Sequence, residues 1–330
     1  MKNLLIAIVT AFLLCACSTS RIATNQGGNI ALKQTGKMDV VSEQAVEHVR
    51  KTLAKAEVDG LPYYTPLHFQ DAQKSLKKVA LLQQNSLSLE GEDINVTIMN
   101  KVFKIEDLVT EGYQLKTLIM DTLSESLKQK IVLDSLDCKK ILPKAYSGIN
   151  KELIALFKLI EKNKIEKAHK AEIGLLADMV DLEIDALIKI YMAPAKAILV
   201  KAEGYGADDY AEKTYDNAES AIEQGEEFIK VNYRDLNEIK KVAAEALLAA
   251  KKALNTGKLS KSMVELGEKE AELKALEMED LLNIIIQGYS ANNLQGLTLQ
   301  QQAQELAKLA RSQTNKIKEL TTSLSANEAH

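Results

Sequence analysis

Apolar residues recur every three or four positions along most of this chain, which is the spacing of one face of an α-helix. The pattern begins near Ser42, the expected N-cap of the first helix, and later predicts helices over residues 210–229, 236–254, 259–286 and 299–324. Several of these segments approach about 30 residues, or roughly 45 Å of helix. Long helices joined by short polar turns predict an all-α fold, specifically an elongated antiparallel helical bundle.

The same pattern indicates where the helices should end. One long helix is expected to carry the residues from Val102 to Leu127 on its apolar side. Proline lacks an amide hydrogen and clashes with the preceding turn, so Pro194 is expected to kink or end a later helix. The expected interruptions are Gly60-Leu61-Pro62, residues 83–93, Pro143, Gly148, Pro194, Gly257 and residues 292–296.

A segment near the start of the chain recurs further along without a gap. Lys55-Ala56-Glu57 matches Lys201-Ala202-Glu203, and both are followed by a glycine, an aromatic residue and an alanine-rich helix. The matched pairs are Gly60 with Gly206, Tyr64 with Tyr210, Phe69 with Tyr215, Ala72 with Ala218 and Leu76 with Ile222. The pattern favours duplication of a helical hairpin, and hence two related bundles in tandem, over a chance likeness of two helix starts.

Composition supports the helical prediction and narrows the classes of partner. The chain has only 15 glycines and 4 prolines, no tryptophan, and 5% aromatic residues, so turns and strands are poorly supplied. Its net charge is −4, and lysine and glutamate are interspersed rather than gathered into one field. A nucleic-acid partner is therefore not expected.

The first residues have the layout of a secretory signal peptide, with a positive start, an apolar run from Leu4 to Leu14, and a small-residue site. The run is shorter than the roughly 20 apolar residues of a transmembrane helix. Its end, Leu14-Cys15-Ala16-Cys17, resembles the lipobox of bacterial lipoproteins, in which a leucine and two small residues precede the lipidated cysteine. The alternative is an ordinary cleaved signal with a chance cysteine.

The lipobox resemblance implies that Cys17 becomes the first residue and carries acyl chains, such as palmitate, on its sulfur and amine. Each buried methylene contributes about 0.8 kcal/mol, so several chains give an effectively permanent membrane anchor. In enterobacterial lipoproteins an aspartate after the cysteine retains the protein in the inner membrane, so Ser18 favours the outer membrane. The expected location is therefore the cell envelope, on the outer membrane and facing the periplasm.

The chain is expected to divide into five parts. Residues 17–40 are polar and cannot bury a core, so they predict a flexible tether. The predicted parts are a signal peptide at 1–16, this lipidated tether, a first helical bundle at 41–200, a second at 201–325 and a frayed tail at 326–330.

The segment from Tyr64-Thr65-Pro66 to Ala72 resembles small helical envelope lipoproteins of unassigned function, in which a Tyr-x-Pro start precedes alanines at helical spacing. Such proteins often lie beside, or are fused to, domains similar to the peptidoglycan-binding part of outer membrane protein A. The second copy, which starts at Tyr210, lacks the proline. The resemblance implies envelope proteins or peptidoglycan-associated proteins as partners, and it brings no known activity.

One pair of residues has the spacing of a metal-binding motif. Glu166 and His169 fit Glu-x-x-His, which places a carboxylate and an imidazole on one helix face. A di-iron bundle needs two such motifs and two further glutamates, and only one motif is present. We therefore expect no metal ligands, no catalytic residues and no cofactor-binding residues.

The remaining candidates have a structural interpretation that we prefer. Asp178, Asp181 and Asp185 share one helix face, which is expected to be the solvated side rather than a cation site. Cys138, the only cysteine beyond the N-terminal region, is expected to be a buried thiol rather than a reactive one. The apolar run Ile284-Ile285-Ile286 is expected to pack in the core, with an interaction or membrane-touching patch as the alternative.

Together these features favour a lipid-anchored, non-enzymatic helical scaffold or binding protein of the bacterial cell envelope. Coiled-coil-like surfaces make self-association or binding to other envelope proteins plausible. Two rival hypotheses remain open at this point. One is a helical metal-binding protein or enzyme built around Glu166 and His169, and the other is a helical pore-forming or surface toxin that uses the region around Ile284.

Overall fold

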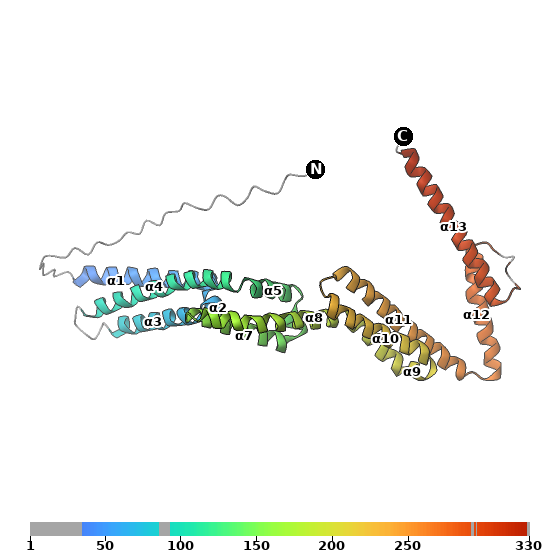
Figure 1. Cartoon of the computed structure of the whole chain (residues 1–330), viewed down its shortest axis with the longest axis horizontal. Helices are drawn as coiled ribbons and strands as arrows, with labels where there is room; N and C mark the ends of the chain where they lie inside the picture. The colour runs from blue at the N-terminus through green and yellow to red at the C-terminus, as the bar shows by residue number, and fades with distance from the viewer. Residues whose placement is uncertain (1–34, 86–92, 292–293, 295, 329–330) are drawn as a thin grey trace. The chain divides into compact units, whose positions relative to one another are not determined.

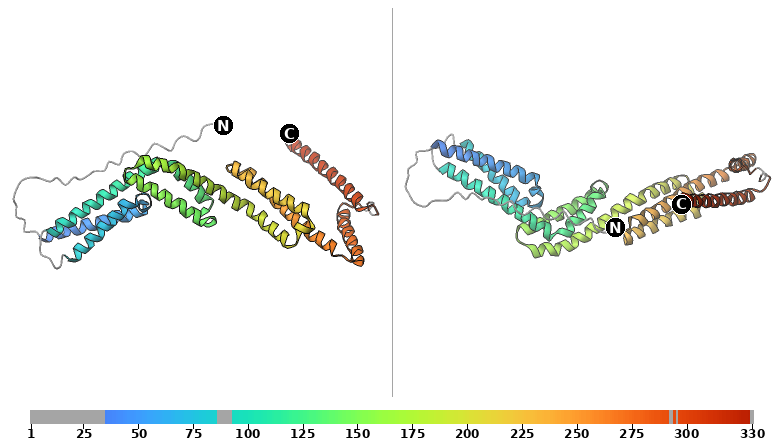
Figure 2. Two further views of the ribbon diagram at one scale, coloured as in Figure 1. Left: turned by 60° about the horizontal axis from the view of Figure 1, so that its bottom comes forward. Right: turned by 90° about the horizontal axis from the view of Figure 1, so that it is seen from above.

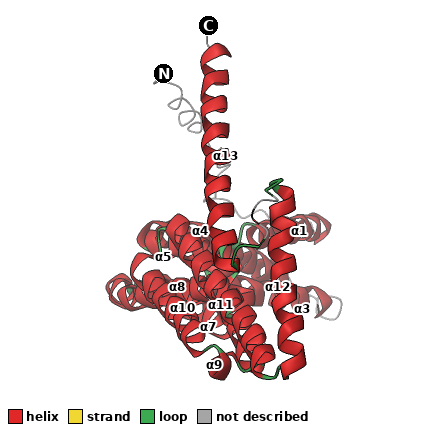
Figure 3. Ribbon diagram, turned by 90° about the vertical axis from the view of Figure 1, so that its right-hand side faces the viewer, coloured by secondary structure: helices red, strands yellow, loops and turns green. Residues whose placement is uncertain are grey.

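A computed structural model describes residues 35–85, 93–291, 294 and 296–328 of the chain. Every regular element in these residues is a helix, and no strand occurs among them (Figures 1 and 3), so the predicted all-α helical bundle is confirmed. The first helices along the chain are α1 (Thr35–Val58), α2 (Leu61–Tyr64), α3 (Pro66–Asn85), α4 (Asp93–Thr122), α5 (Ser124–Ser135) and α6 (Cys138–Ile141). The later ones are α7 (Pro143–Glu161), α8 (Ile165–Gly204), α9 (Ala207–Tyr210), α10 (Glu212–Asn232), α11 (Leu236–Val264), α12 (Glu268–Gly288) and α13 (Leu299–Glu328).

The chain forms two compact units, which divide between Gln114 and Leu115. The division expected from the sequence, between residues 200 and 201, instead falls inside α8, which continues without a break from Ile165 to Gly204. The structure therefore places the boundary inside α4, between Gln114 and Leu115. Continuity of α8 is the physical reason, because both of its halves bury residues against neighbouring helices of the second unit.

In the first unit, α1, α3 and the first part of α4 pack around one apolar core. The core residues follow helical spacing on each element, as the sequence pattern predicts. They include Val49, Leu53 and Ala56 on α1, Phe69, Ala72 and Val79 on α3, and Val102, Ile105 and Val109 on α4. Leu61 of the short helix α2 closes this core.

In the second unit, α8 is the central helix. It contacts α5, α6 and α7, and it also contacts α9, α10 and α11. Its own buried residues, such as Leu187, Met192 and Leu199, join Ile222, Ile229 and Ile239 in one core. The helices α10 and α11 run side by side along it (Figure 2). Farther along the chain, α12 and α13 pack on each other through a separate small cluster, which contains Ile286, Ala291, Leu294 and Leu306.

Several helix ends differ from the sequence prediction. The first helix begins at Thr35 rather than at Ser42, so residues 35–40 of the predicted tether are helical. Ser42 is not an N-cap, and its hydroxyl instead donates to Asn95 Oδ1 at 3.1 Å. The helix expected to reach Leu127 ends at Thr122, and Leu123 leaves helical geometry as the N-cap of α5. The helix expected over 259–286 is divided by residues 265–267.

Three expected interruptions lie inside helices. Gly148 is within α7, Pro194 within α8 and Gly257 within α11. The proline removes one backbone hydrogen bond, but its neighbours Met192 and Ala195 are fully buried and hold α8 in place. Gly257 is helical because α9 packs directly against it: a Cβ built on Gly257 would lie 2.5 Å from the Cβ of Ala207. Its role is close helix approach rather than chain reversal.

The predicted repeat has a shared backbone geometry. Gly60 and Gly206 both adopt left-handed dihedrals, with φ of +83° and +75°, and each starts a one-turn helix whose first residue is fully buried. That buried residue, Leu61 or Ala207, packs against a glycine of a later helix, which is Gly112 in α4 or Gly257 in α11. The glycine break therefore bends the chain and inserts a short helix against a neighbour.

A third copy of this kink occurs at Asp137, where the sequence offers no glycine. Asp137 has a φ of +58°, and the one-turn helix α6 that follows it begins at the fully buried Cys138. The residue after each short helix leaves helical geometry, at Thr65, Leu142 and Ala211. Pro143 then begins α7 as Pro66 begins α3. The chain thus repeats one three-helix design three times, and α8 serves as the last long helix of the second copy and the first of the third.

Candidate functional site

The residue on which the functional prediction depends, Cys17, lies outside the described residues, as does the predicted signal peptide. The predicted loop at 83–93 and the turn at 292–296 also fall largely outside them. Lipidation of Cys17 therefore stays a prediction from the sequence. In the described residues, no helix has the length and apolar character that a membrane crossing requires.

The structure does not bring further ligands to the Glu-x-x-His pair. Glu166 and His169 are both exposed on α8, and His169 Nδ1 lies 3.5 Å from a single carboxylate oxygen, Oε2 of Glu172. Within the described ranges, no group of three or more histidine, cysteine or acidic side chains is arranged to hold a metal ion. Asp178, Asp181 and Asp185 are all exposed, which agrees with the solvated helix face predicted for them.

Cys138 is fully buried at the start of α6, as predicted for a structural thiol. Burial, reinforced by the nearby Glu183 carboxylate, raises the pKa of this thiol to about 11. A thiol with that pKa is protonated at neutral pH and is a poor nucleophile. The structure therefore gives Cys138 a packing role on the inner side of the kink.

The region around Ile284 is more exposed than core packing would require. Ile286 is fully buried against α13, but Ile284 and Ile285 are 67% and 46% exposed. The expectation that the whole run packs in the core is therefore wrong for these two residues. The physical reason is that α12 has only one described helix neighbour of substantial contact, α13, so only one of its faces is covered.

A row of buried polar side chains lies between α5 and α8, where an ordinary bundle would have apolar residues. Ser126 Oγ donates to Glu172 Oε1 at 2.8 Å, and Gln129 Nε2 donates to Glu183 Oε2 at 2.6 Å. All four residues are less than 10% exposed. A buried carboxylate is costly unless it is hydrogen-bonded, so each of these pairs specifies which residue of α5 must face which residue of α8.

Arg234 extends this row to a third element, the turn between α10 and α11. Its guanidinium lies 3.2 Å from Glu183 Oε1 and donates to Gln129 Oε1, also at 3.2 Å. Glu183 is 4% exposed, whereas the Arg234 side chain is 57% exposed, so the cation reaches from the surface to a buried anion. We name Ser126, Gln129, Glu172, Glu183 and Arg234 the polar seam.

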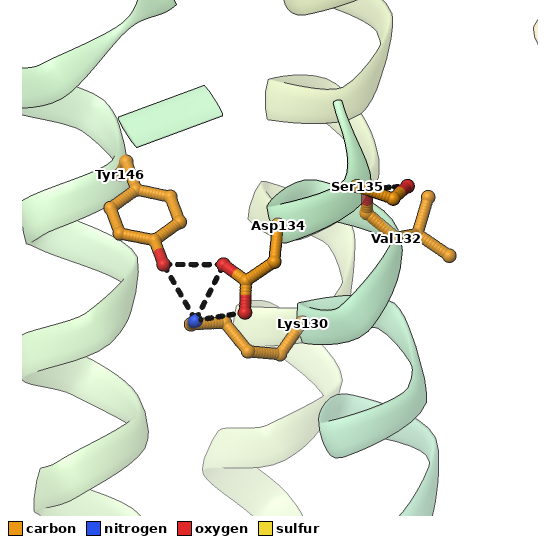
Figure 4. A network of polar contacts seen from close by, with 5 residues as sticks. All are labelled: Lys130, Val132, Asp134, Ser135 and Tyr146. Atoms are coloured by element: carbon orange, nitrogen blue, oxygen red, sulfur yellow. Dashed lines mark hydrogen bonds and ion pairs between the residues drawn. The ribbon is translucent and has the colours of Figure 1, made fainter. Parts of the chain in front are cut away.

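A second polar network joins α5 to α7 (Figure 4). Lys130 Nζ lies 2.8 Å from both carboxylate oxygens of Asp134 and 2.6 Å from the Tyr146 hydroxyl, which itself donates to Asp134. Burial opposes the charge on Lys130 and Asp134, but their mutual hydrogen bonds outweigh it, so the pKa of Lys130 is raised and that of Asp134 is lowered. The network is therefore a stable ion pair at neutral pH and not a poised proton donor or acceptor.

Sequence reasoning missed the polar seam, although part of its signal was available. Glu172 and Glu183 occupy positions of the α8 face that is otherwise apolar, with Leu175, Met179 and Leu187. Carboxylates at core spacing indicate buried partners. The partners of these two glutamates could not be found in the same way, because they lie 46, 54 and 51 positions away along the chain.

The polar seam and the Lys130 network both join helices of the second unit to one another. The polar groups of the seam are directed at one another, and the shifted pKa values of Lys130 and Asp134 favour the charge pair that these two residues form. No protein family, no curated protein and no solved structure matches this chain in comparisons with each. The geometry and the sequence pattern therefore carry the functional argument by themselves.

Proposed function

We propose that this chain is a bacterial envelope lipoprotein, held to a membrane by acyl chains on Cys17, and that it acts as a non-enzymatic helical scaffold or binding protein. The observation that carries the proposal is the segment Leu14-Cys15-Ala16-Cys17 directly after an apolar run. The outer membrane, with the helices facing the periplasm, is the proposed location because Ser18 follows the cysteine.

The helical units support a scaffold in a physical sense. The kinked three-helix design occurs three times, and the second and third copies are continuous through the helix α8, which they share. Repeated units of this kind extend surface without enlarging a single core, which is typical of proteins that bind other macromolecules. The polar seam and the Lys130 network set how α5 aligns with α8 and α7, because each pairs a residue of α5 with a defined residue on another helix.

Metabolic labelling tests the proposal directly. Cells that produce the full chain are grown with an alkyne-bearing palmitate, and the chain is then purified and coupled to a fluorophore. The proposal expects label on the wild-type chain and none on Cys17→Ser, because the acyl chains are attached through residue 17. Cys138→Ser is the matched control, and it should label like wild type because the Cys138 thiol is buried. Equal labelling of Cys17→Ser and wild type would refute the anchor.

A binding role has its own test. The wild-type chain and the Cys17→Ser variant are each crosslinked in cells, isolated, and analysed by mass spectrometry. The proposal expects defined envelope proteins with wild type and their loss, or strong depletion, when the anchor is absent. A hydrolase or transferase activity in the purified chain, with no envelope protein recovered, would contradict the non-enzymatic part of the proposal.

A further inference from the structure

The outer side of α12 is an apolar surface that no described residue of its own unit covers. The side of α12 that packs on α13 carries Leu282, Ile286 and Tyr289. Leu273 lies nine residues before Leu282, which is about two and a half helical turns, so it projects from the opposite side. We name the residues on that side the outer face: they are Leu273, Leu276, Leu281 and Ile284, and each is at least half exposed.

The second half of α13 is likewise exposed on all sides among the described residues. Every residue from Arg311 to Ser325 is exposed, and we name this stretch the free segment. Ile317, Leu320 and Leu324 follow one another at spacings of three and four within it, and they continue the stripe that includes Leu306. Such spacing is the seam of a helix that packs against another helix.

The free segment has little intrinsic stability as an isolated helix. It spans about 15 residues, and isolated helices of that length are marginal in water. The hydroxyls of Thr314, Thr321 and Thr322 bond back to carbonyls four residues earlier, which favours the helix little. A partner that buries Ile317 and Leu320 would supply the missing stabilisation.

The two surfaces have opposite charge. Between residues 270 and 288, α12 carries five carboxylates and one lysine, for a net charge of −4. Two of these carboxylates, Glu277 and Asp280, lie among the apolar residues of the outer face. The free segment carries Arg311, Lys316 and Lys318 against a single glutamate, for a net charge of +2. The surfaces are therefore complementary in charge as well as apolar.

The free segment cannot cover the outer face of its own α12. Leu306 belongs to the same continuous helix as the free segment, and it packs in the cluster with Ile286, on the side of α12 opposite the outer face. Reaching around to that face would require α13 to break. A second copy of the chain can present its α12 without any such bend.

We infer that α12 and α13 form a reciprocal homodimer: the free segment of each copy lies along the outer face of α12 in the other. The two contacts are identical, so the assembly closes as a two-fold dimer and does not propagate. This inference goes beyond the proposed function, since it does not depend on a lipid at Cys17. An unmodified Cys17 would refute the anchor and leave the dimer untouched.

Site-specific photo-crosslinking in cells tests the dimer with the full chain. Leu320 is replaced by p-benzoylphenylalanine in copies that carry one affinity tag, and an unmodified copy with a second tag is produced beside them. After irradiation, the inference expects an adduct that carries both tags, at about twice the chain mass of 36.4 kDa. Its crosslinked peptide should come from residues 270–288. The matched control is the same replacement at Ile131, which is 68% exposed on α5 and should give no such adduct.

Charge exchange distinguishes specific pairing of the free segment with α12 from non-specific hydrophobic association. Lys316→Glu with Lys318→Glu should reduce the Leu320 adduct by about tenfold, because it places like charges against α12. When both tagged copies also carry Glu277→Lys and Asp280→Lys, the adduct should be restored, because the free segment is then acidic and the outer face of α12 basic in each copy. These positions are exposed in the free segment and on α12, so any loss of helical circular dichroism signal should be limited to the free segment. An adduct confined to one chain, an adduct to another protein, or no recovery on charge exchange would overturn the inference.

Discussion

The contact between α9 and α11 offers the sharpest test of the kinked three-helix design. A Cβ at Gly257 would lie 2.5 Å from the Cβ and 2.8 Å from the Cα of Ala207. Ordinary contact begins near 3.4 Å, so Gly257→Ala requires α9 and α11 to separate by roughly 1 Å. Overpacking of this kind costs about 1–3 kcal/mol, whereas alanine in place of glycine returns about 1 kcal/mol of helix propensity. The expected net loss of stability is therefore up to about 2 kcal/mol.

The same substitution elsewhere in the second unit should have the opposite sign. Gly174 is exposed in the middle of α8, and a Cβ there meets nothing within 4 Å, so Gly174→Ala should stabilise the chain by about 0.5–1 kcal/mol. Gly225→Ala is intermediate, because its Cβ would lie 2.9 Å from Sδ and Cε of Met192, the end of a flexible side chain. Little net change is expected there, since Met192 can shift.

Urea unfolding followed by circular dichroism at 222 nm measures this series, with the change in the transition midpoint as the readout. The order of stability should be Gly174→Ala above wild type, Gly225→Ala near wild type, and Gly257→Ala below it. If Gly257→Ala stabilised the chain as much as Gly174→Ala, helix propensity alone would explain both variants. The close approach of α9 to α11 would then be wrong.

Three further predictions concern the polar groups. In urea unfolding, Arg234→Met should destabilise the second unit by about 1–3 kcal/mol, because it leaves the buried Glu183 without its cation. Adding Glu183→Gln to that variant should recover part of the lost stability. No recovery would contradict the role given to Arg234 in the polar seam. The pKa of Asp134 is lowered in the folded chain, so its contribution to folding stability is present above the pKa of the unfolded carboxyl and is lost as the pH falls through the folded pKa. Lys130→Met should therefore flatten the acid side of a profile of stability against pH. An unchanged profile would refute the pairing of Lys130 with Asp134. Burial and the Asp59 carboxylate raise the pKa of Tyr113 to about 12. In an absorbance titration at 295 nm, Tyr113→Phe should therefore remove a tyrosine that ionises later than the others. Loss of a tyrosine with the usual pKa would contradict the structure.

The sequence predicted the parts of the fold that depend on local spacing. The apolar faces of α1, α3 and α4 follow directly from periodicity, and the left-handed glycines Gly60 and Gly206 were visible because glycine is the usual residue for that conformation. Asp137 performs the same role without that signal, since aspartate tolerates left-handed dihedrals but seldom requires them. The third kink was therefore missed, although Pro143 stands where Pro66 stands in the first.

Features that depend on long-range packing were beyond local reasoning. Glycine often ends a helix, yet Gly257 lies within α11 because Ala207, fifty positions earlier, packs against it. Pro194 similarly stays within α8 because the surrounding core holds that helix. The polar seam depends on partners from three separate elements, and only the positions of Glu172 and Glu183 could have indicated it. In each case, tertiary contacts decided what a residue's local preference left open.

Mass spectrometry of the N-terminal peptide, from the chain isolated from the cells that naturally make it, is the decisive test of the proposed anchor at Cys17. We predict a peptide that begins at Cys17 and carries the mass of a diacylglyceryl group on its sulfur, with a further acyl group on the amine where the cell adds one. A peptide that continues through Ala16 into Cys17, or a Cys17 with an unmodified thiol, would contradict the membrane anchor and the envelope role proposed from it.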